Sequence, residues 1–358
     1  MKLGCSVLLG TLCAATAFDC VASDRFGFLP DKGDANLTFY LDNDLFANTD
    51  QNYTNGIRLS WISGARDPNE FGRVQRWLKR LNGDSESRSL FRKLSGFSGH
   101  EVLEYNYGFS LTQLMFTPED LLAPVAPRGQ RPYAGWLGVD LSLQTKDDRA
   151  LNALGLAIGT TGPHSYAEEA QNFVHDLRGL DEFQGWDSQI PNEATLNLYS
   201  TQRRRIILND PGWGRFGIDG FTEWRMALGT FLTSANVGSL IRFGWNLPLD
   251  FADARLSVTA YSHQPFTTSR KQRSSWSFYG VVGALGSAVA HNITLDGPVF
   301  RNFDTGTSSR PLVGELYAGF GVRYRRWNFS YVHTYRSKEF EGQDEAPSFG
   351  SLTLSYQL

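Results

Sequence analysis

The sequence predicts an all-β protein, and more narrowly a transmembrane antiparallel β-barrel of about twelve strands. Hydrophobic residues alternate with small or polar residues in many segments of the chain, which is the period of a half-buried strand. Aromatic residues make up 13% of the 358 residues, and 36 residues are glycine. The mean hydropathy is -0.31, and beyond the N-terminus no second long apolar run predicts a membrane-spanning helix. Outer-membrane barrels share this composition, because lipid-facing and lumen-facing residues alternate along their strands.

The N-terminus differs from the rest of the chain. Lys2 precedes an apolar stretch from Ser6 to Phe18, and small residues follow near Ala22. This pattern predicts a secretory signal peptide over residues 1–22, which leaves residues 23–358 as a single outer-membrane barrel domain.

Cleavage there would also remove every cysteine of the sequence, namely Cys5, Cys13 and Cys20. The mature chain could then form neither a disulfide nor a zinc-thiolate site, and it would have no cysteine nucleophile. Lipid attachment at Cys13 or Cys20 is the alternative, but before Cys20 the acidic Asp19 stands where a small residue is expected.

The expected strands follow from the alternation, as in Leu352, Leu354 and Tyr356 at the C-terminus. An even strand number places both termini in the periplasm. A soluble β-sandwich is the alternative, but its apolar face would be rich in aliphatic residues, whereas Trp and Tyr here lie near segment ends. The twelve predicted strands are 36–46, 55–64, 102–113, 134–146, 150–161, 192–207, 213–230, 238–248, 275–291, 312–326, 327–337 and 348–358.

Residues 253–263 also alternate, but a strand there would make the number odd, so we expect a periplasmic excursion. A second periplasmic feature is the insertion 65–101. Asp67, Pro68 and the apolar spacing up to Leu81 predict an amphipathic helix within it. This basic helix could rest on anionic lipid headgroups, or it could be an ordinary solvated insertion.

A second helix is predicted over residues 166–180, on the extracellular side. Ser165 and Glu168 fit a capping box, and Gly179 fits a helix end. Gln171 and His175 lie one turn apart and therefore project from one face. A lone histidine on a helix is more often a surface or packing residue than a catalyst. The predicted apolar stripe consists of Tyr166, Ala170, Phe173 and Leu177.

Polar residues also gather where the first two strands meet. Asn43 and Asp44 end the first strand and Thr54 opens the second, so all three should lie at the same extracellular rim. Polar side chains on the wall of a barrel are costly if they face lipid, which favours a functional role. Turn chemistry alone also favours Asn and Asp in a hairpin loop, so both interpretations stay open.

Taken together, these residues resemble those of the outer-membrane lipid A 3′-O-deacylases, the LpxR-like proteins. Each motif alone is weak, but the order and spacing of the motifs along a signal-peptide-bearing β chain are specific, and they cover most of the mature sequence. The motifs are 42–44, 53–56, 130–137, 159–163, Gln171 with His175, and 186–190.

The resemblance implies a twelve-stranded barrel in the outer membrane of a Gram-negative bacterium. The implied activity is Ca²⁺-dependent hydrolysis of the 3′-linked acyloxyacyl ester of lipid A in lipopolysaccharide. The family motif carries over Asn43, Asp44, Thr54, Gln171 and His175 as functional positions. A family glutamate is replaced here by Asp181, a shorter acid. Candidate contacts to the lipid phosphates are Arg128 and Arg131.

The chemistry can also be argued from the residue types. Histidine is the natural general base for a hydrolytic water, which suits His175, and Gln171 could orient that water or the substrate. Asp44 offers the anionic oxygen that Ca²⁺ prefers. Asn43 and Thr54 could donate hydrogen bonds to the oxyanion or hold the metal site. We therefore expect a carboxylic ester hydrolase that forms no covalent acyl-enzyme.

Two other functions fit a barrel of this composition. One is a serine-dependent outer-membrane phospholipase, although the sequence has no Gly-x-Ser-x-Gly motif. The other is a porin or structural barrel, against which a filled lumen would count. With 34 basic and 37 acidic residues the chain has no global basic field, so no nucleic-acid partner is expected. We expect a monomer.

Overall fold

The computed structural model describes residues 35–43, 55–64, 104–147, 149–179, 183–209, 214–248, 250–251, 255 and 276–358. The chain divides into two compact units, Met1–Gly33 and Asp34–Leu358, and every described residue belongs to the second. The predicted signal peptide and the predicted helix in the 65–101 insertion lie outside the described residues, as do Asp44, Thr54 and Asp181.

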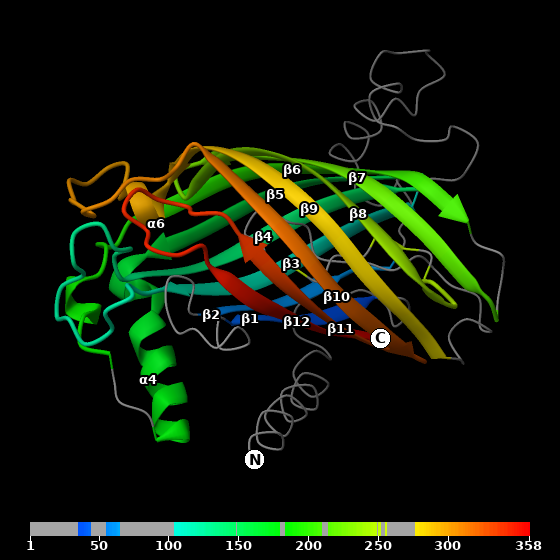
Figure 1. Cartoon of the computed structure of the whole chain (residues 1–358), viewed down its shortest axis with the longest axis horizontal. Coiled ribbons are helices and arrows are strands. Elements are labelled where there is room, and N and C mark those ends of the chain that lie inside the picture. Colours follow the sequence, from blue (N-terminus) through cyan, green and yellow to red (C-terminus); the bar gives the residue numbers. More distant parts are fainter. Residues whose placement is uncertain are drawn as a thin grey trace, which may run out of the picture. The chain divides into compact units, whose positions relative to one another are not determined.

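Twelve antiparallel strands close into a barrel, as the sequence predicted (Figure 1). Each strand pairs with its neighbours in the chain, and β12 pairs with β1 to remove the sheet edge. The strands are β1 (Asn36–Asn43), β2 (Asn55–Ile62), β3 (Glu104–Phe116), β4 (Ala134–Lys146), β5 (Ala150–Thr161), β6 (Ala194–Asn209), β7 (Phe216–Gly229), β8 (Leu232–Trp245), β9 (Trp276–Asn292), β10 (Leu312–Tyr324), β11 (Trp327–Arg336) and β12 (Ser348–Gln357).

The two ends of the barrel differ, because one carries the helices and the other carries the start of β1 and the end of β12. The helix rim is the end where β1, β3 and β5 finish, and it carries α4 (Ala167–Arg178) and α6 (Ile293–Asp296) (Figure 1). The terminal rim is the opposite end, where β1 begins and β12 finishes. None of the helices in the described part of the chain is long and apolar enough to cross a membrane.

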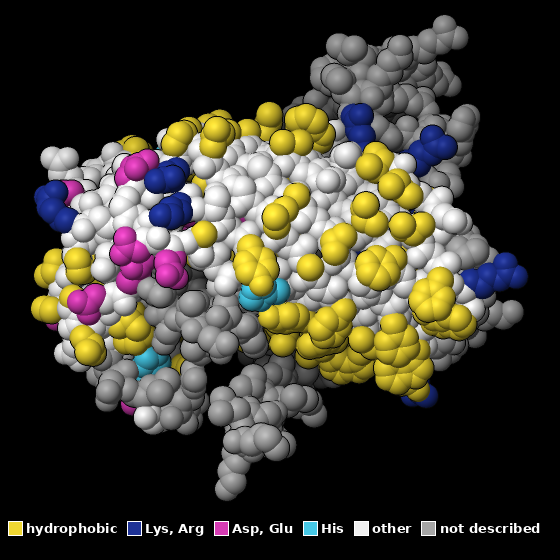
Figure 2. All heavy atoms as spheres, viewed as in Figure 1, with side chains coloured by type: hydrophobic (Ala, Val, Ile, Leu, Met, Phe, Trp, Pro, Cys, Tyr) yellow, Lys and Arg dark blue, Asp and Glu magenta, His cyan; other side chains and the backbone are white. Residues whose placement is uncertain are grey.

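Apolar side chains cover the outside of the wall, as a lipid-facing surface requires (Figure 2). Leu141 and Trp224 are each 57% exposed, although both lie mid-strand, and Leu228 near the end of β7 is 67% exposed. At the terminal rim Trp276 stacks on Tyr324 with ring centroids 4.3 Å apart, an aromatic cluster of the kind that marks a membrane interface. A soluble sandwich would bury these apolar faces, so this alternative fails.

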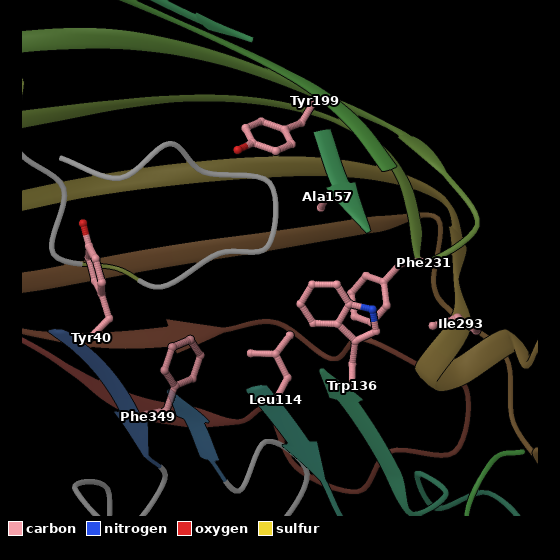
Figure 3. Close-up of a cluster of buried hydrophobic side chains, with 8 residues drawn as sticks. All are labelled: Tyr40, Leu114, Trp136, Ala157, Tyr199, Phe231, Ile293 and Phe349. Atoms are coloured by element: carbon pink, nitrogen blue, oxygen red, sulfur yellow. The ribbon is translucent and has the colours of Figure 1, made fainter. Parts of the chain in front are cut away.

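Side chains of the described residues fill most of the lumen, which leaves a cavity of about 170 Å³ beside Arg131 and Phe231. One buried cluster lies inside the barrel near the helix rim and includes Trp136, Tyr199 and Phe231 (Figure 3). Trp136 and Phe231 have ring centroids 4.8 Å apart. Deeper in the lumen, buried ions pair across strands. These pairs include Arg58 with Asp140, Arg203 with Glu223, Arg242 with Asp219, and Arg255 with Glu315.

The connection from β8 to β9 departs from the sequence prediction. Of the segment 253–263, expected as a periplasmic excursion, the structure describes Arg255, which lies inside the barrel with its guanidinium 3.9 Å from the ring centroid of Tyr317. The preceding Phe251 is also buried, and its carbonyl accepts a hydrogen bond from Arg203 at 2.7 Å. The luminal arginines supply the reason, since buried cations need acceptors. This filling counts against a porin.

Strand β8 begins at Leu232, earlier than the predicted 238, because a side chain holds the turn before it. Asn197 Oδ1 accepts a hydrogen bond from the Phe231 N–H at 2.9 Å. Its Nδ2 donates to the carbonyl of Leu232 at 2.6 Å. The first residues of β8 alternate weakly in sequence, so contacts from other parts of the chain, such as this one from Asn197, mark where β8 begins.

Candidate functional site

Helix α4 packs on the outside of the barrel wall. Phe109 and Leu111 on β3 are 47% and 46% exposed, so Gln113 and Met115, at the same parity, also face outward. Gln113 Nε2 donates to the carbonyls of Ser165 and Tyr166 at 2.7 and 3.1 Å. These bonds and the packing of Met115 hold the start of α4 against the outer wall. The cluster around Met115 contains Tyr133, Ala167 and Trp186.

The start of α4 differs from the predicted capping box. The helix begins at Ala167, and its N-cap Tyr166 has φ 54 and no side-chain cap. Ser165 instead closes the preceding 3-10 turn η2 (Gly162–Ser165), donating from Oγ to the carbonyl of Gly162 at 2.6 Å. Pro163 favours this turn, which uses the serine that a capping box would need. The capping box is therefore wrong, whereas the predicted end at Gly179 is confirmed, with φ 65.

The buried side of α4 is also not the predicted apolar stripe. Tyr166 and Phe173 are 59% and 64% exposed. The buried side consists of Ala167, Gln171 and His175, at 1%, 4% and 6% exposure. The start of α4 lies so close to β4 that a Cβ added at Gly135 would collide with Ser165 and Ala167. This close approach leaves room for small residues but not for large apolar ones at the start of the buried face. The helix thus buries the two polar residues that the sequence predicted as functional, Gln171 and His175.

Gln171 and His175 therefore lie on the same buried face of α4, shielded from solvent. The His175 ring meets Phe183 edge-on with centroids 4.6 Å apart. Neither Nε2 nor Oε1 of Gln171 has a hydrogen-bond partner among the described residues. A buried amide left without a partner costs about 1–3 kcal/mol. Such a group is expected where a ligand or a water supplies the missing bonds.

Two asparagines extend this outer face. Asn43 on β1 pairs in register with Asn55 on β2, and Asn55 pairs with Met115 on β3. Strands lie about 5 Å apart, so Asn43 is roughly 10 Å from Met115. The Oδ1 atom of Asn55 is buried and has no partner among the described residues. Sequence reasoning chose Asn43 but missed Asn55, although Asn55 shares the outward parity of Ile57 and Leu59.

The two predicted phosphate-binding arginines occupy contrasting places. Arg131 is 1% exposed, and its guanidinium lies 3.0 Å from Glu339 and 4.8 Å from the centroid of the Phe116 ring. Burial opposes ionisation of Glu339, but Arg336 and Arg131 hold the pKa of its carboxyl below the ordinary value. Arg131 thus closes a luminal ion network and is poorly placed to meet a lipid phosphate.

Arg128, in contrast, is 82% exposed at the helix rim, with its guanidinium 2.6 Å from Asp304. A backbone N–H from Gly306 and then Arg128 lower the pKa of the Asp304 carboxyl. An exposed pair of this kind opens at little cost, so Arg128 is available to an anionic headgroup.

The structure describes only some of the residues that could hold a metal ion. Within the described ranges, no group of three or more His, Cys, Asp or Glu could hold an ion. The oxygen donors that are described on the outer face are the side-chain amides of Asn43, Asn55 and Gln171. Ca²⁺ accepts amide and carbonyl oxygens together with carboxylates, so the unsatisfied amide oxygens of Asn55 and Gln171 fit this ion. The predicted carboxylate ligands Asp44 and Asp181 lie outside the described residues.

Comparison with known proteins supports the fold and assigns a family. The model of the family described as outer membrane protein LpxR matches residues 5–358. The structure of LpxR from Salmonella typhimurium matches with a TM-score of 0.69 at 16% identity, covering 90% of this chain and 100% of that one. The β domain of the Bordetella autotransporter BrkA matches with a TM-score of 0.41 at 10% identity, covering 90% and 98%. No curated protein matches this chain.

Proposed function

The chain belongs to the LpxR family of outer membrane proteins, and on that premise we propose that it is a lipid A 3′-O-deacylase. The protein lies in the outer membrane of a Gram-negative bacterium. In this proposal the helix rim is extracellular and the outer face beneath α4 is the active site. The reaction is hydrolysis of the 3′-linked acyloxyacyl ester of lipid A, so the enzyme is a carboxylic ester hydrolase.

One observation supports this proposal most strongly. The polar groups of α4 face the outside of the barrel wall, where Gln171 and His175 are 4% and 6% exposed and the Gln171 amide has no partner among the described residues. A pore would place its polar groups in the lumen, and here the lumen is filled. An enzyme whose substrate is a lipid of the surrounding leaflet needs its polar groups on the lipid-facing side.

The chain's own residues divide the work of ester hydrolysis. His175 accepts a proton from the attacking water, and its contact with Phe183 fixes the ring plane. Gln171, one turn earlier, holds the water or the ester through its unsatisfied amide. Asn43 and Thr54 donate to the oxyanion that develops at the carbonyl. The water attacks the acyl carbon, the sugar oxygen leaves with a proton, and a free fatty acid is released, with no covalent acyl-enzyme.

Calcium is the cofactor in this proposal. Asp44 and Asp181 would hold the ion together with amide oxygens of the outer face, and the ion would supply a positive charge that polarises the ester carbonyl. Arg128, exposed at the same rim, would contact a lipid phosphate. The buried Arg131 is dropped from that role, because its charge is already balanced by Glu339.

The test is mass spectrometry of lipid A after incubation with the folded, detergent-solubilised protein. We expect loss of the 3′ acyloxyacyl mass in the presence of Ca²⁺ and unchanged lipid A with a chelator. Glycerophospholipid is the matched alternative substrate. Release of fatty acid from phospholipid with lipid A unchanged would replace this proposal with an outer-membrane phospholipase, and inactivation by a serine-directed reagent would exclude the water mechanism.

A further inference from the structure

A second feature of the outer wall lies far from α4. A groove of about 830 Å³ runs across β8 to β11 on the surface that the lipid contacts. Its outward lining includes Val237, Ala284, Gly286, Gly314, Leu316 and Tyr335. In the ring of twelve strands, β9 and β10 are half-way around from β3 and β4, which carry α4. The groove is therefore separate from the proposed active site.

The floor of the groove is open because two paired glycines form it. Gly286 on β9 pairs in register with Gly314 on β10. A Cβ added to Gly314 would meet nothing within 4 Å, and one added to Gly286 would meet only the Val237 carbonyl oxygen at 3.9 Å. Neither glycine has a positive φ. Neither packing within the described residues nor backbone conformation therefore requires glycine at these two positions.

Another glycine of the same strand shows the usual alternative. A Cβ on Gly280 would lie 2.6 Å from the ring of Phe243, so an aromatic side chain already covers that glycine. Glycine inside a strand weakens it, and it often marks a place where a ligand approaches the backbone closely. Gly286 and Gly314 fit that second role, since no described residue occupies the space above them.

The position of the groove identifies the membrane leaflet that fills it. Gly286 lies ten residues after Trp276 at the terminal rim. With about 3.3 Å per residue and a tilt near 40°, it stands roughly 25 Å above that aromatic cluster, in the outer half of the membrane. Apolar walls rise beside it, since Leu316 and Tyr335 are each 64% exposed. Lipid of the outer leaflet must cover this surface.

The upper end of the groove is polar, and basic residues lie near it in the chain. Ser337 joins the floor, because its N–H donates to the Gly314 carbonyl at 2.8 Å and its Oγ accepts from the Gly314 N–H at 2.9 Å. Lys338 follows directly in the chain. The nearby Arg310 is 39% exposed; its Nε donates to the Phe340 carbonyl, and its guanidinium lies 3.6 Å from the carboxylate of the exposed Glu341. A ligand with an apolar tail and a phosphate at the membrane surface matches this order of groups.

We propose that this groove is a lipid-binding site that holds one acyl chain of a phosphorylated glycolipid with the chemistry of lipid A. Its volume lies in the range of sites that bind drug-sized ligands. The chain rests on the backbone at Gly286 and Gly314, and the phosphate faces Lys338. The lining contains no histidine, and its one carboxylate, Glu315, is already ion-paired with Arg255 and Arg336, so the lipid bound there is not cleaved. This proposal rests on the outer-membrane location and does not require hydrolysis at α4.

The test is native mass spectrometry of the protein extracted from outer membranes in mild detergent. The wild type should retain a lipid A species, and the double variant Gly286→Leu/Gly314→Leu should retain at least fivefold less, because its side chains fill the groove. Val139→Leu, at a 37% exposed position of β4 on the opposite wall, is the matched control and should retain lipid as the wild type does. Folding of each variant is checked by its thermal unfolding midpoint.

Three outcomes would overturn the proposal: equal retention of lipid A by the double variant, retention of phospholipid in place of lipid A, or no retained lipid in the wild type. If the double variant does not fold, Gly314→Val alone makes the same test, since its Cβ meets empty space. Lys338→Gln should lower retention of bisphosphorylated lipid A at least twofold more than that of dephosphorylated lipid A. An equal effect on both would contradict the phosphate contact.

Discussion

Replacing Gln171 with methionine should make the protein more stable and less active at once. The Gln171 side chain is 4% exposed, and both of its polar atoms lack partners among the described residues. Removing an unsatisfied buried amide while keeping its shape recovers its desolvation penalty, about 1–3 kcal/mol. The activity should fall at least a hundredfold, since the amide then cannot hold the water or the ester. The free energy of unfolding is measured by urea titration in lipid vesicles, and the rate by release of fatty acid.

Gln113 provides the matched control, because it is a glutamine on the same wall whose Nε2 donates two hydrogen bonds. Gln113→Met should lower the free energy of unfolding by about 1–2 kcal/mol, since two carbonyls lose their donor. A Gln171→Met variant that is destabilised like Gln113→Met would refute the reasoning. It would mean that the Gln171 amide bonds within the protein and is not held ready for a ligand.

Three further outcomes follow from the same structure. Asn55→Leu should lower the initial deacylation rate at least tenfold with a change of less than about 1 kcal/mol in stability, because its buried Oδ1 has no partner among the described residues; an unchanged rate would remove Asn55 from the site. Arg242→Met should cost about 3–5 kcal/mol in urea unfolding, since Asp219 and Asp250 would remain buried without their cation; a neutral effect would contradict the luminal network. The pKa of the Glu339 carboxyl is lowered in the folded state, so its ionised form stabilises the fold at pH values above its ordinary pKa of 4.5. This stabilisation is lost as the pH falls through the pKa of the folded state. The unfolding midpoint of Glu339→Gln should therefore depend less on pH below 4.5 than that of the wild type.

The barrel itself could be predicted because its physical signal is local. Alternation of apolar and polar residues at period two follows directly from a wall with lipid on one side, and all twelve strands appear near the predicted ranges. Where the predicted start of a strand or the predicted path of a connection was wrong, contacts with residues distant in the chain set the observed structure. Asn197 holds the turn before β8, Arg203 binds the carbonyl of Phe251, and the carboxylate of Glu315 pairs with Arg255 inside the barrel. Such contacts leave no periodic trace in the sequence.

The geometry of the candidate site could be predicted in part, because the spacing of two residues along a helix is also a local signal. The spacing of Gln171 and His175 places them on one helix face, and the structure buries that face. The apolar stripe with Phe173 pointed to the opposite face, because hydrophobicity normally marks the buried side. Here Phe173 is 64% exposed, as is common for apolar side chains of a membrane protein, so hydrophobicity does not mark the face that packs on the barrel. Sequence patterns also could not show that Arg131 is neutralised by Glu339, which is distant in the chain.

A comparison of two histidine variants tests directly whether His175 is the general base of the proposed reaction. His175→Ala removes the buried imidazole of α4, whereas His164→Ala removes an exposed imidazole on the preceding turn of the same rim. Both are assayed for release of the 3′ acyl chain from lipid A in Ca²⁺, with folding checked by the unfolding midpoint. The account predicts a rate reduced at least a thousandfold for His175→Ala and unchanged for His164→Ala. Equal rates for the wild type and a folded His175→Ala would contradict it.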